Sequence, residues 1–397
     1  MVSEIRSGLP ERPPVFFYSS FPLGFHNVEA ERKALAFADA GYEVLYATAP
    51  LIRNPRPADL GRLRRVAARR LGGAGRLGTS PPSPLQSTTL RLLPPRQFAA
   101  VRRLNGRWIA RQVRGRLSRD QRPVAWLRWP TPEVIDALIH LQPAVTIYEV
   151  VDSYWETPGI VGRWRSVYER AERALLARAD LVVASGEVIA SRFRELGCAV
   201  RLLPHGVDLP GSVAPGRPAG PTTLGFVGTL DYRLDIPVIR ALAESHPEWR
   251  VRLAGPITEG FDRQSLADLP NVSVEPPVPY PLLEERLSEF DVGLMPYFDH
   301  AHYLHMSPVK NLELLAAGKP AVARPSPALE PFGDLLYFAR TPEEFVRQTE
   351  WALAEDSAER FEQRRAVAAE HTWDRRHQEM LSLVDEALAG DARRAHD

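Results

Sequence analysis

A lysine and a glutamate one turn apart stand on a stretch that otherwise has the pattern of a buried helix. The sequence from 307 to 320 predicts a short helix with Ser307 as N-cap and Pro308 at the first helical position. Lys310 falls in the first turn, where the helix dipole disfavours a cation, and Glu313 falls among apolar neighbours. These positions predict a site for a ligand that offers an anion to the lysine and hydrogen-bond donors to the carboxylate.

Each of the two side chains also has a purely structural interpretation. The Lys310 side chain can run along the helix surface and place its ammonium group in water. The Glu313 carboxylate can be buried as the partner of an arginine. The residue types alone leave these alternatives open.

Alternating strands and helices must position this pair. The predicted strands fall into two series, each interleaved with helical segments, which favours an α/β fold with parallel sheets. The sequence therefore predicts two doubly wound domains that bind ligands beyond the carboxyl ends of their strands. The first series comprises residues 15–18, 42–48, 124–128, 145–151, 181–184 and 200–203, and the second comprises residues 223–228, 249–254, 272–275, 291–296, 321–323 and 335–338.

A segment rich in proline and glycine, residues 209–221, is the predicted linker between the domains. It separates an N-terminal domain of residues 12–208 from a C-terminal domain of residues 222–370. Residues 371–397 form a final helix that we expect to pack back on the N-terminal domain. The cleft between the two domains is the predicted active site.

The composition is that of a globular protein. The chain has 397 residues, of which 44% are hydrophobic and 25% are charged. Its one cysteine, Cys198, excludes an internal disulfide framework and a zinc site built from several thiolates. The sequence has no uninterrupted apolar run of about 18 residues and no apolar signal core, so we expect a cytoplasmic protein.

The near-neutral net charge of +1 conceals a basic segment. Residues 52–122 contain 18 arginines and only two acidic residues, Asp59 and Asp120. One interpretation is a face that contacts an anionic surface, such as the headgroups at the inner face of a membrane. The alternative is a solvated, arginine-rich helical hairpin. Nucleic acid is disfavoured as a partner because the segment has no interleaved aromatic pattern and no recognisable binding module.

Five stretches, taken in order, resemble the group-1 type of glycosyltransferase. They comprise residues 202–208, 225–230, 291–296, 307–320 and 371–374. The resemblance implies the GT-B fold, in which two Rossmann-like domains face each other across a cleft, and it implies transfer of a sugar from a nucleotide sugar. It also makes the N-terminal domain the acceptor-binding domain and the C-terminal domain the nucleotide-sugar-binding domain.

Two shorter stretches resemble one subgroup of these glycosyltransferases in particular. Residues 148–154 and 308–313 are similar to a subgroup of the teichuronic-acid type, and there is a more distant likeness to inverting glucuronosyltransferases of bacterial exopolysaccharide assembly. In one respect the sequence departs from the pattern of many retaining members. His305 stands eight residues before Glu313, where those enzymes carry a first glutamate, so the stereochemical outcome stays open.

The resemblance implies a donor site around the opening helix. The helix N-terminus and Lys310 would bind the donor diphosphate, and Glu313 would accept hydrogen bonds from ribose hydroxyls. Backbone N–H groups of Thr229 and Leu230 would contact phosphates, and Arg233 would neutralise them unless it pairs with Asp231 or Asp235 instead. Tyr280 would contact the base of the donor nucleotide. The full expected donor set is Gly228, Thr229, Leu230, Arg233, Tyr280, Met306, Ser307, Pro308, Val309, Lys310 and Glu313.

The catalytic base is expected from the N-terminal domain. Asp152 follows a predicted strand at the cleft end of the sheet and could take the proton of the acceptor hydroxyl, or it could cap the following turn. His26, in the first loop, is the second catalytic candidate. His205 and His305 are further cleft candidates, and Asp208 is expected to hold the hinge.

We expect no cofactor and no metal, because the helix N-terminus and Lys310 would stabilise the leaving diphosphate. The expected partners are a nucleotide-sugar donor and an acceptor that is a saccharide, a lipid-linked saccharide or a small molecule. Two alternatives remain, a sugar-nucleotide epimerase on the same fold and a non-catalytic anion-binding protein.

Overall fold

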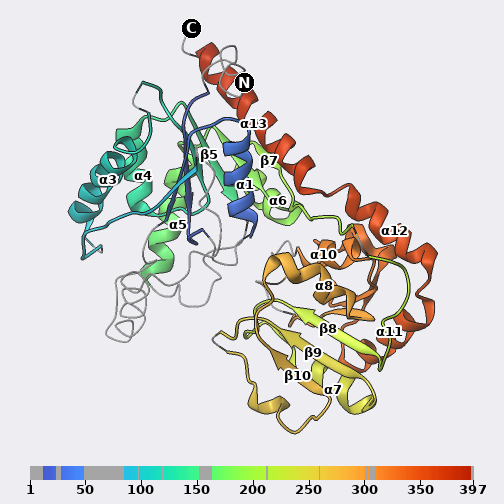
Figure 1. Cartoon of the computed structure of the whole chain (residues 1–397). Coiled ribbons are helices and arrows are strands. Elements are labelled where there is room, and N and C mark those ends of the chain that lie inside the picture. Colours follow the sequence, from blue (N-terminus) through green and yellow to red (C-terminus); the bar gives the residue numbers. More distant parts are fainter. Residues whose placement is uncertain are drawn as a thin grey trace.

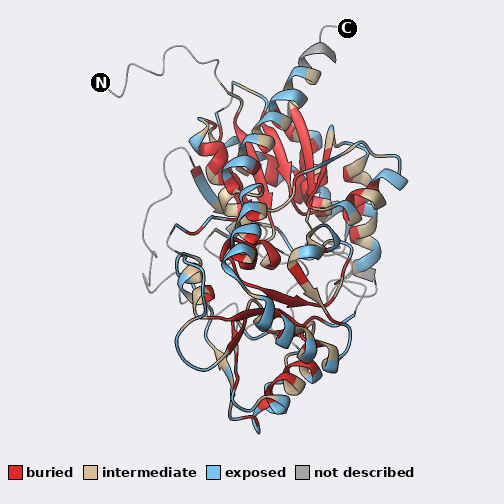
Figure 2. Ribbon diagram, turned by 90° about the vertical axis from the view of Figure 1, so that its right-hand side faces the viewer, coloured by how far each residue is buried: buried red, intermediate tan, exposed pale blue. Residues whose placement is uncertain are grey.

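Two parallel β-sheets, each with helices on both faces, make up the molecule (Figure 1). The computed structural model describes residues 12–23, 28–48, 85–96, 98–118, 120–151, 163–211, 213–258, 260–299, 303 and 309–394. The strands are the most buried parts of both halves, as Figure 2 shows. The predicted pair of doubly wound α/β domains is confirmed.

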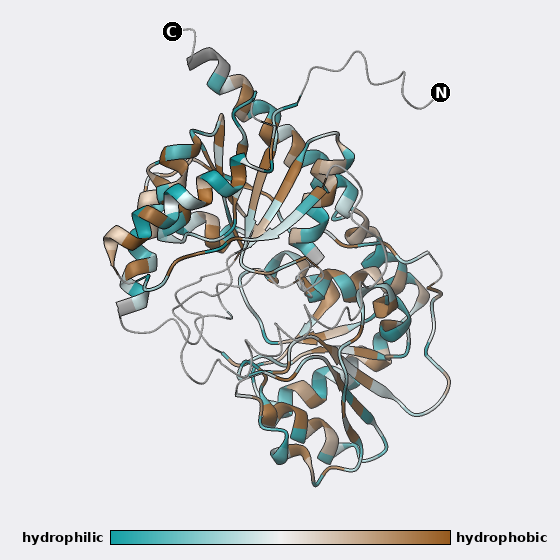
Figure 3. Cartoon of the chain, turned by 60° about the vertical axis from the view of Figure 1, so that its left-hand side comes forward, coloured by the Kyte–Doolittle hydropathy of each residue, from teal (hydrophilic) through white to brown (hydrophobic). Residues whose placement is uncertain are grey.

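The first sheet has seven strands in the order β3-β2-β1-β4-β5-β6-β7, and every neighbouring pair is parallel. The central strands of this sheet read as apolar runs because both faces are covered, and Figure 3 shows much of these strands in brown. The strands are β1 (Val15–Ser19), β2 (Val44–Thr48), β3 (Leu85–Thr89), β4 (Val124–Leu127), β5 (Val145–Val150), β6 (Leu181–Ala184) and β7 (Val200–Leu202).

Two hydrophobic clusters lie on the two faces of this sheet. One joins the sheet to α3 (Ala99–Arg114), α4 (Pro132–Leu141), α5 (Arg163–Leu176) and α6 (Glu187–Glu195). The other joins it to α1 (Val28–Asp39) and to Met380 and Val384 of the last helix. That helix, α13 (Trp373–Arg394), thus returns from the second domain to the first (Figure 1).

The second sheet has six parallel strands in the order β10-β9-β8-β11-β12-β13 around one hydrophobic cluster. Its strands are β8 (Thr223–Val227), β9 (Arg250–Ala254), β10 (Val272–Glu275), β11 (Val292–Met295), β12 (Ala321–Ala323) and β13 (Leu336–Phe338). Its α-helices are α7 (Ile236–Ser245), α8 (Leu283–Ser288), α10 (Lys310–Ala316), α11 (Pro342–Glu355) and α12 (Ala358–Ala369), and short 3-10 helices span Gln264–Leu266, Tyr280–Leu282 and Glu330–Leu335.

Each sheet has one point at which the strand order reverses. It falls between β1 and β4 in the first sheet and between β8 and β11 in the second. Ligands of doubly wound sheets bind beyond the carboxyl ends of the strands at such switch points. The segments that follow these four strands are therefore the places to look for a site.

Two chain segments cross between the domains side by side. Val207 forms a parallel bridge with Thr372, and the Val207 N–H donates to His371 O at 2.9 Å. Gly206 packs so closely on Trp373 that an added Cβ would lie 2.6 Å from the indole ring. The crossing is thus a paired connection, and glycine is required at position 206 for the two segments to touch.

Two local predictions differ from the structure. Helix α10 begins at Lys310 with Val309 as its N-cap, so it starts three residues after the predicted N-cap Ser307. Strand β3, within the basic segment, was not predicted, because its central residues are exposed and carry no apolar run. None of the helices in the described ranges is both long and apolar enough to cross a membrane.

The first domain buries one carboxyl group whose charge is poorly compensated. Glu172 of α5 accepts a hydrogen bond from the Tyr148 hydroxyl at 2.7 Å, and an Arg192 nitrogen lies 3.6 Å from its other oxygen. Burial nevertheless dominates and raises the pKa of Glu172 to about 7. The fold therefore favours the protonated form of this side chain.

We predict a pH-dependent stability that the variant Glu172→Gln lacks. The contribution of protonated Glu172 is fully present below its ordinary pKa of 4.5 and is lost as the pH rises through about 7. Between pH 4.5 and pH 8, the free energy of unfolding of the wild type should fall by roughly 3 kcal/mol relative to the variant. Urea titrations at both pH values measure this difference, and parallel pH profiles would contradict the assignment.

Candidate functional site

Lys310, the first residue of α10, points its side chain at the loop after β8. Its Nζ lies 5.7 Å from the centroid of the Phe226 ring. It also packs on Gly228, where an added Cβ would lie 2.4 Å from Lys310 Cε and 2.5 Å from Nζ. Glycine at position 228 thus makes room for the lysine. The side chain does not extend along the helix into water, so the snorkelling alternative is wrong.

No carboxylate among the described residues compensates the Lys310 ammonium group within ion-pair distance. Burial lowers the pKa of Lys310, and the nearby charge of Arg233 lowers it further, against the opposing effects of Glu313 and Asp231. A cation held without a partner in a partly desolvated place is costly for the fold. Such a cation is the kind of group that an anionic ligand would complete.

Glu313 follows on the next turn of the same helix. Burial raises the pKa of Glu313, while the charges of Lys310 and His205 lower it. Its carboxylate has no hydrogen-bond or ion-pair partner in the part of the chain that the structure describes, so the predicted alternative of an arginine partner is not observed there. The helix therefore presents one cation and one carboxylate that the fold itself does not use.

The loop after β8 only partly matches its prediction. The Leu230 N–H donates to Pro256 O at 3.0 Å, and the Leu230 side chain is fully buried. The expected phosphate contact through this N–H is therefore wrong, because the fold already uses the group. The N–H of Gly228 is likewise used by the fold, since it donates to Ala254 O at 2.9 Å. The predicted phosphate contact of the Thr229 N–H, between these two residues, stays a prediction.

Arg233 forms the ion pair that was the alternative to phosphate binding. Its Nε and Nη2 atoms donate to Asp231 at 3.0 and 2.7 Å. Asp235 pairs instead with Arg324, at 2.7 Å. The prediction that Arg233 is a free cation for phosphate is therefore wrong. Its charge still lowers the pKa of Lys310.

Tyr280 lies at the junction between the domains. Its hydroxyl is 3.5 Å from Trp373 Nε1, and the guanidinium of Arg32 lies 5.1 Å from the centroid of its ring. Burial raises the pKa of Tyr280 to about 12, and the charges of Asp208 and Glu313 contribute in the same direction. Arg32 also pairs with Asp208, so Asp208 ties the connecting segment to α1, as predicted.

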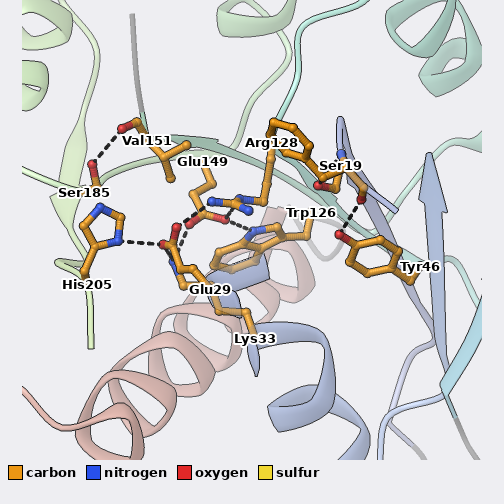
Figure 4. Close-up of polar contacts among 11 residues, drawn as sticks. Ser19, Glu29, Lys33, Tyr46, Trp126, Arg128, Glu149, Val151, Ser185 and His205 are labelled. Atoms are coloured by element: carbon orange, nitrogen blue, oxygen red, sulfur yellow. Dashed lines mark hydrogen bonds and ion pairs between the residues drawn. The ribbon is translucent and has the colours of Figure 1, made fainter. Parts of the chain in front are cut away.

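A network of buried charges occupies the carboxyl edge of the first sheet (Figure 4). Glu149, on β5, accepts hydrogen bonds from Trp126 Nε1 at 2.5 Å and from Lys33 Nζ. An oxygen of Glu149 also lies 3.0 Å from Arg128 Nε. Lys33, Trp126 and Glu149 are at most 1% exposed and Arg128 is 3% exposed, so these charges depend on one another rather than on water.

Glu29, in the first turn of α1, completes this network. Its carboxylate accepts from Lys33 Nζ at 2.6 Å and from Arg128 Nη2 at 2.8 Å, and it lies 3.2 Å from His205 Nδ1. Burial alone would raise the pKa of Glu29, but the charges of His205, Lys33 and Arg128 outweigh it and hold the pKa well below its ordinary value. The carboxylate is therefore ionised and serves as an anchor.

His205 links the two halves of the site. Its Nδ1 is held by Glu29 of the first domain, and its charge acts on Glu313 of the second. The two switch points therefore face each other, with His205 between them. That His205 lines the cleft stays a prediction, with which these two contacts are consistent.

Six of the predicted site residues lie outside the described residues, and their predictions stay untested. Four residues of the charge network were not predicted as site residues, namely Glu29, Lys33, Arg128 and Glu149. A glutamate inside an otherwise apolar strand was the one signal for this network, because such a charge needs partners. The six untested residues are His26, Asp152, His305, Met306, Ser307 and Pro308.

Comparisons with known proteins agree with this geometry. The profile of a family described as "Glycosyl transferase-like" matches residues 236–382, which include α10. The proposed teichuronic acid biosynthesis glycosyltransferase TuaH of Bacillus subtilis (strain 168) is 27% identical over 282 residues, which cover 64% of this chain and 70% of TuaH. The chain is a glycosyltransferase of the GT-B fold.

Solved structures support the fold of this transferase. Anabaena HepE in complex with UDP-glucose has a TM-score of 0.65 at 13% sequence identity, and the match covers 94% of this chain and all of that chain. The α,α-trehalose 6-phosphate synthase of Burkholderia multivorans has a TM-score of 0.60 at 11% identity, with 97% and 99% of the two chains covered.

We predict that removing one charge from the buried network destabilises the transferase. In Glu149→Gln, Lys33 and Arg128 would share the single carboxylate of Glu29, so the free energy of unfolding should fall by about 3 kcal/mol. The matched control is Glu169→Gln, which removes the exposed pair with Arg165 and should cost less than about 1 kcal/mol. Chemical denaturation measures both, and equal losses would contradict the network.

Proposed function

We propose that this transferase moves a sugar from a nucleoside diphosphate sugar to an acceptor hydroxyl. The observation that carries the proposal is the ammonium group of Lys310, which has no counter-charge among the described residues and sits at the switch point of the second sheet. A diphosphate would supply the missing negative charge. The UDP-glucose in Anabaena HepE, which shares the fold, supports a uridine nucleotide as the donor.

In this proposal each donor residue has one task. Lys310 binds a phosphate oxygen and stabilises the charge that develops as the diphosphate leaves. Glu313, one turn further on, accepts hydrogen bonds from the ribose hydroxyls. The backbone N–H of Thr229 contacts the phosphates, and Gly228 leaves room for the Lys310 side chain beside this loop.

The acceptor would bind at the first domain, across the cleft from the donor. We propose Asp152 as the base that takes the proton of the acceptor hydroxyl while its oxygen attacks the anomeric carbon. The bond between the sugar and the diphosphate then breaks, and the nucleotide leaves with both electrons. His26 would contact the acceptor, and the ionised Glu29 would keep His205 oriented at the edge of this site.

A saccharide, free or linked to a lipid, is the acceptor class that the similarity to TuaH supports, since that protein is named for teichuronic acid biosynthesis. For a lipid-linked acceptor the transferase must reach a membrane surface. We propose that the basic segment of residues 52–122 makes this peripheral contact.

Lys310→Met is the sharpest test of the donor site. Removing a cation that has no partner among the described residues should leave the ligand-free protein as stable as the wild type or more stable. The same change should weaken binding of uridine diphosphate about 10- to 100-fold, because one charge-assisted hydrogen bond is lost. Glu313→Gln should weaken it as well. Thermal unfolding with uridine, guanosine, adenosine and thymidine diphosphates measures both effects, and a ligand at about 100 times its Kd adds roughly 2.7 kcal/mol.

Lys319→Met is the matched control, three residues beyond the end of α10. Lys319 is 6% exposed and donates to Ser288 O at 3.1 Å, so its loss should lower stability and leave nucleotide affinity unchanged. Weakened binding in Lys319→Met but not in Lys310→Met would contradict the assignment. Conversion of the donor in the absence of an acceptor would point to the epimerase alternative.

We also predict that chelation does not stop transfer. If Lys310 supplies the positive charge at the leaving diphosphate, initial rates with and without excess EDTA should agree within about twofold. The rate of sugar transfer to a saccharide acceptor gives the readout. A rate that collapses in EDTA and returns on addition of Mg²⁺ would show that a metal carries this role.

A further inference from the structure

Helix α3 exposes large apolar side chains on its outward face. Leu104 is 49% exposed and Trp108 is 45% exposed, and the two lie one turn apart on the same side of the helix. Phe98, the N-cap residue, is 57% exposed. The opposite side of the helix carries Ile109 and Val113, which pack into the first domain. The outward side is therefore apolar without being part of the core.

The same face is positively charged. Arg103, Arg107 and Arg111 are exposed, and none of them forms an ion pair with a carboxylate among the described residues. The sequence of α3 contains no acidic residue. The cations and the apolar side chains thus alternate around Leu104 and Trp108, which is the composition of helices that lie in the interface of a bilayer.

A shallow hollow of about 410 Å³ continues this face toward α4. Arg107, Arg111, Arg114 and His140 are among the residues that line it. Ile139, which precedes His140 in α4, is 54% exposed. A hollow lined by arginines matches a phosphate headgroup, and an exposed aliphatic side chain on the neighbouring helix matches acyl chains.

We propose that the outward face of α3, defined by Phe98, Leu104, Trp108, Arg107 and Arg111, docks on an anionic lipid membrane. Lipid is favoured over nucleic acid because the exposed Leu104 and Ile139 side chains have no counterpart in a phosphate backbone, whereas acyl chains would cover them. Cations near an anionic bilayer each contribute to binding, and the apolar side chains enter the headgroup layer.

The place of α3 in the fold gives this docking a direction. Helices that follow parallel strands begin at the carboxyl edge of the sheet. Arg96, just before α3, pairs with Glu133 in the first turn of α4. The start of α3 therefore lies at that edge. α3 lies on the far side of the first domain from α13 (Figure 1). A membrane on this face would lie beside the acceptor side of the cleft.

Sedimentation of the full chain with vesicles tests the proposal. We expect binding to vesicles of phosphatidylcholine with 30% phosphatidylglycerol, and at least tenfold weaker binding to phosphatidylcholine alone. Raising the salt should weaken the binding, because charges at the bilayer surface are screened. No sedimentation with the anionic vesicles at low salt would overturn the proposal.

Variants separate insertion from simple charge attraction. Leu104→Ser with Trp108→Ser should weaken binding to anionic vesicles about tenfold, and Arg107→Ser should weaken it roughly fivefold. The matched control is Trp351→Ser, which changes a tryptophan of α11 in the second domain that is 54% exposed and should leave binding unchanged. Equal binding by the Leu104/Trp108 variant and the wild type would overturn the docking face.

Two further readouts keep the result interpretable. Circular dichroism and the melting temperature establish that the variants are folded. Binding of uridine diphosphate in solution should be the same for the Leu104/Trp108 variant and the wild type, because α3 is not part of the donor site. Loss of vesicle binding with intact nucleotide binding supports the docking face. The proposal rests on the membrane contact proposed above for residues 52–122, but its failure would leave the proposed sugar transfer standing, because nucleotide binding is measured separately. Self-association of the wild type that disappears in the Leu104/Trp108 variant, without vesicle binding, would assign the face to a second copy of the chain and overturn the membrane proposal.

Discussion

The carboxylate of Glu29 is the centre of a charge network that joins four segments of the first domain. It binds Lys33 within its own helix, Arg128 after β4 and His205 on the segment that leaves the domain, and Lys33 and Arg128 in turn hold Glu149 of β5. Because Lys33, Arg128 and Glu149 are at most 3% exposed, removing one charged group would leave its buried partners with less compensation. The position of the cleft edge, and of the connection that starts at His205, depends on this network.

The two switch points differ in how far their charges are compensated. In the first domain every cation of the network has a carboxylate, which makes the edge rigid. In the second domain Arg233 is compensated by Asp231, but Lys310 and Glu313 are left without partners among the described residues. The uncompensated charges lower the folding stability at the second site, as is common at positions that bind a ligand. His205 lies between the two, so closure of the cleft would bring the rigid edge against the open charges.

The sequence predicted those parts whose signals are local. Apolar runs gave the strands, and the odd placement of Lys310 and Glu313 on one helix pointed to the donor side. The network around Glu149 was missed because its partners come from α1, β4 and β5, and only the fold brings them together. Strand β3 was missed because it is half exposed. The N–H of Leu230 was assigned to phosphate because its hydrogen bond to Pro256 O, in the loop after β9, is visible only in the fold. Long-range contacts therefore account for the errors at Glu149 and Leu230, and exposure accounts for the error at β3.

The central claim is that Lys310 and Glu313 are left open for a nucleoside diphosphate. A crystal structure of the chain soaked with uridine diphosphate tests this directly, since it locates the ligand atoms. We predict a phosphate oxygen within hydrogen-bond distance of Lys310 Nζ, next to Gly228, and a ribose hydroxyl on the Glu313 carboxylate. A nucleotide bound elsewhere, with Lys310 and Glu313 unchanged, would contradict the account.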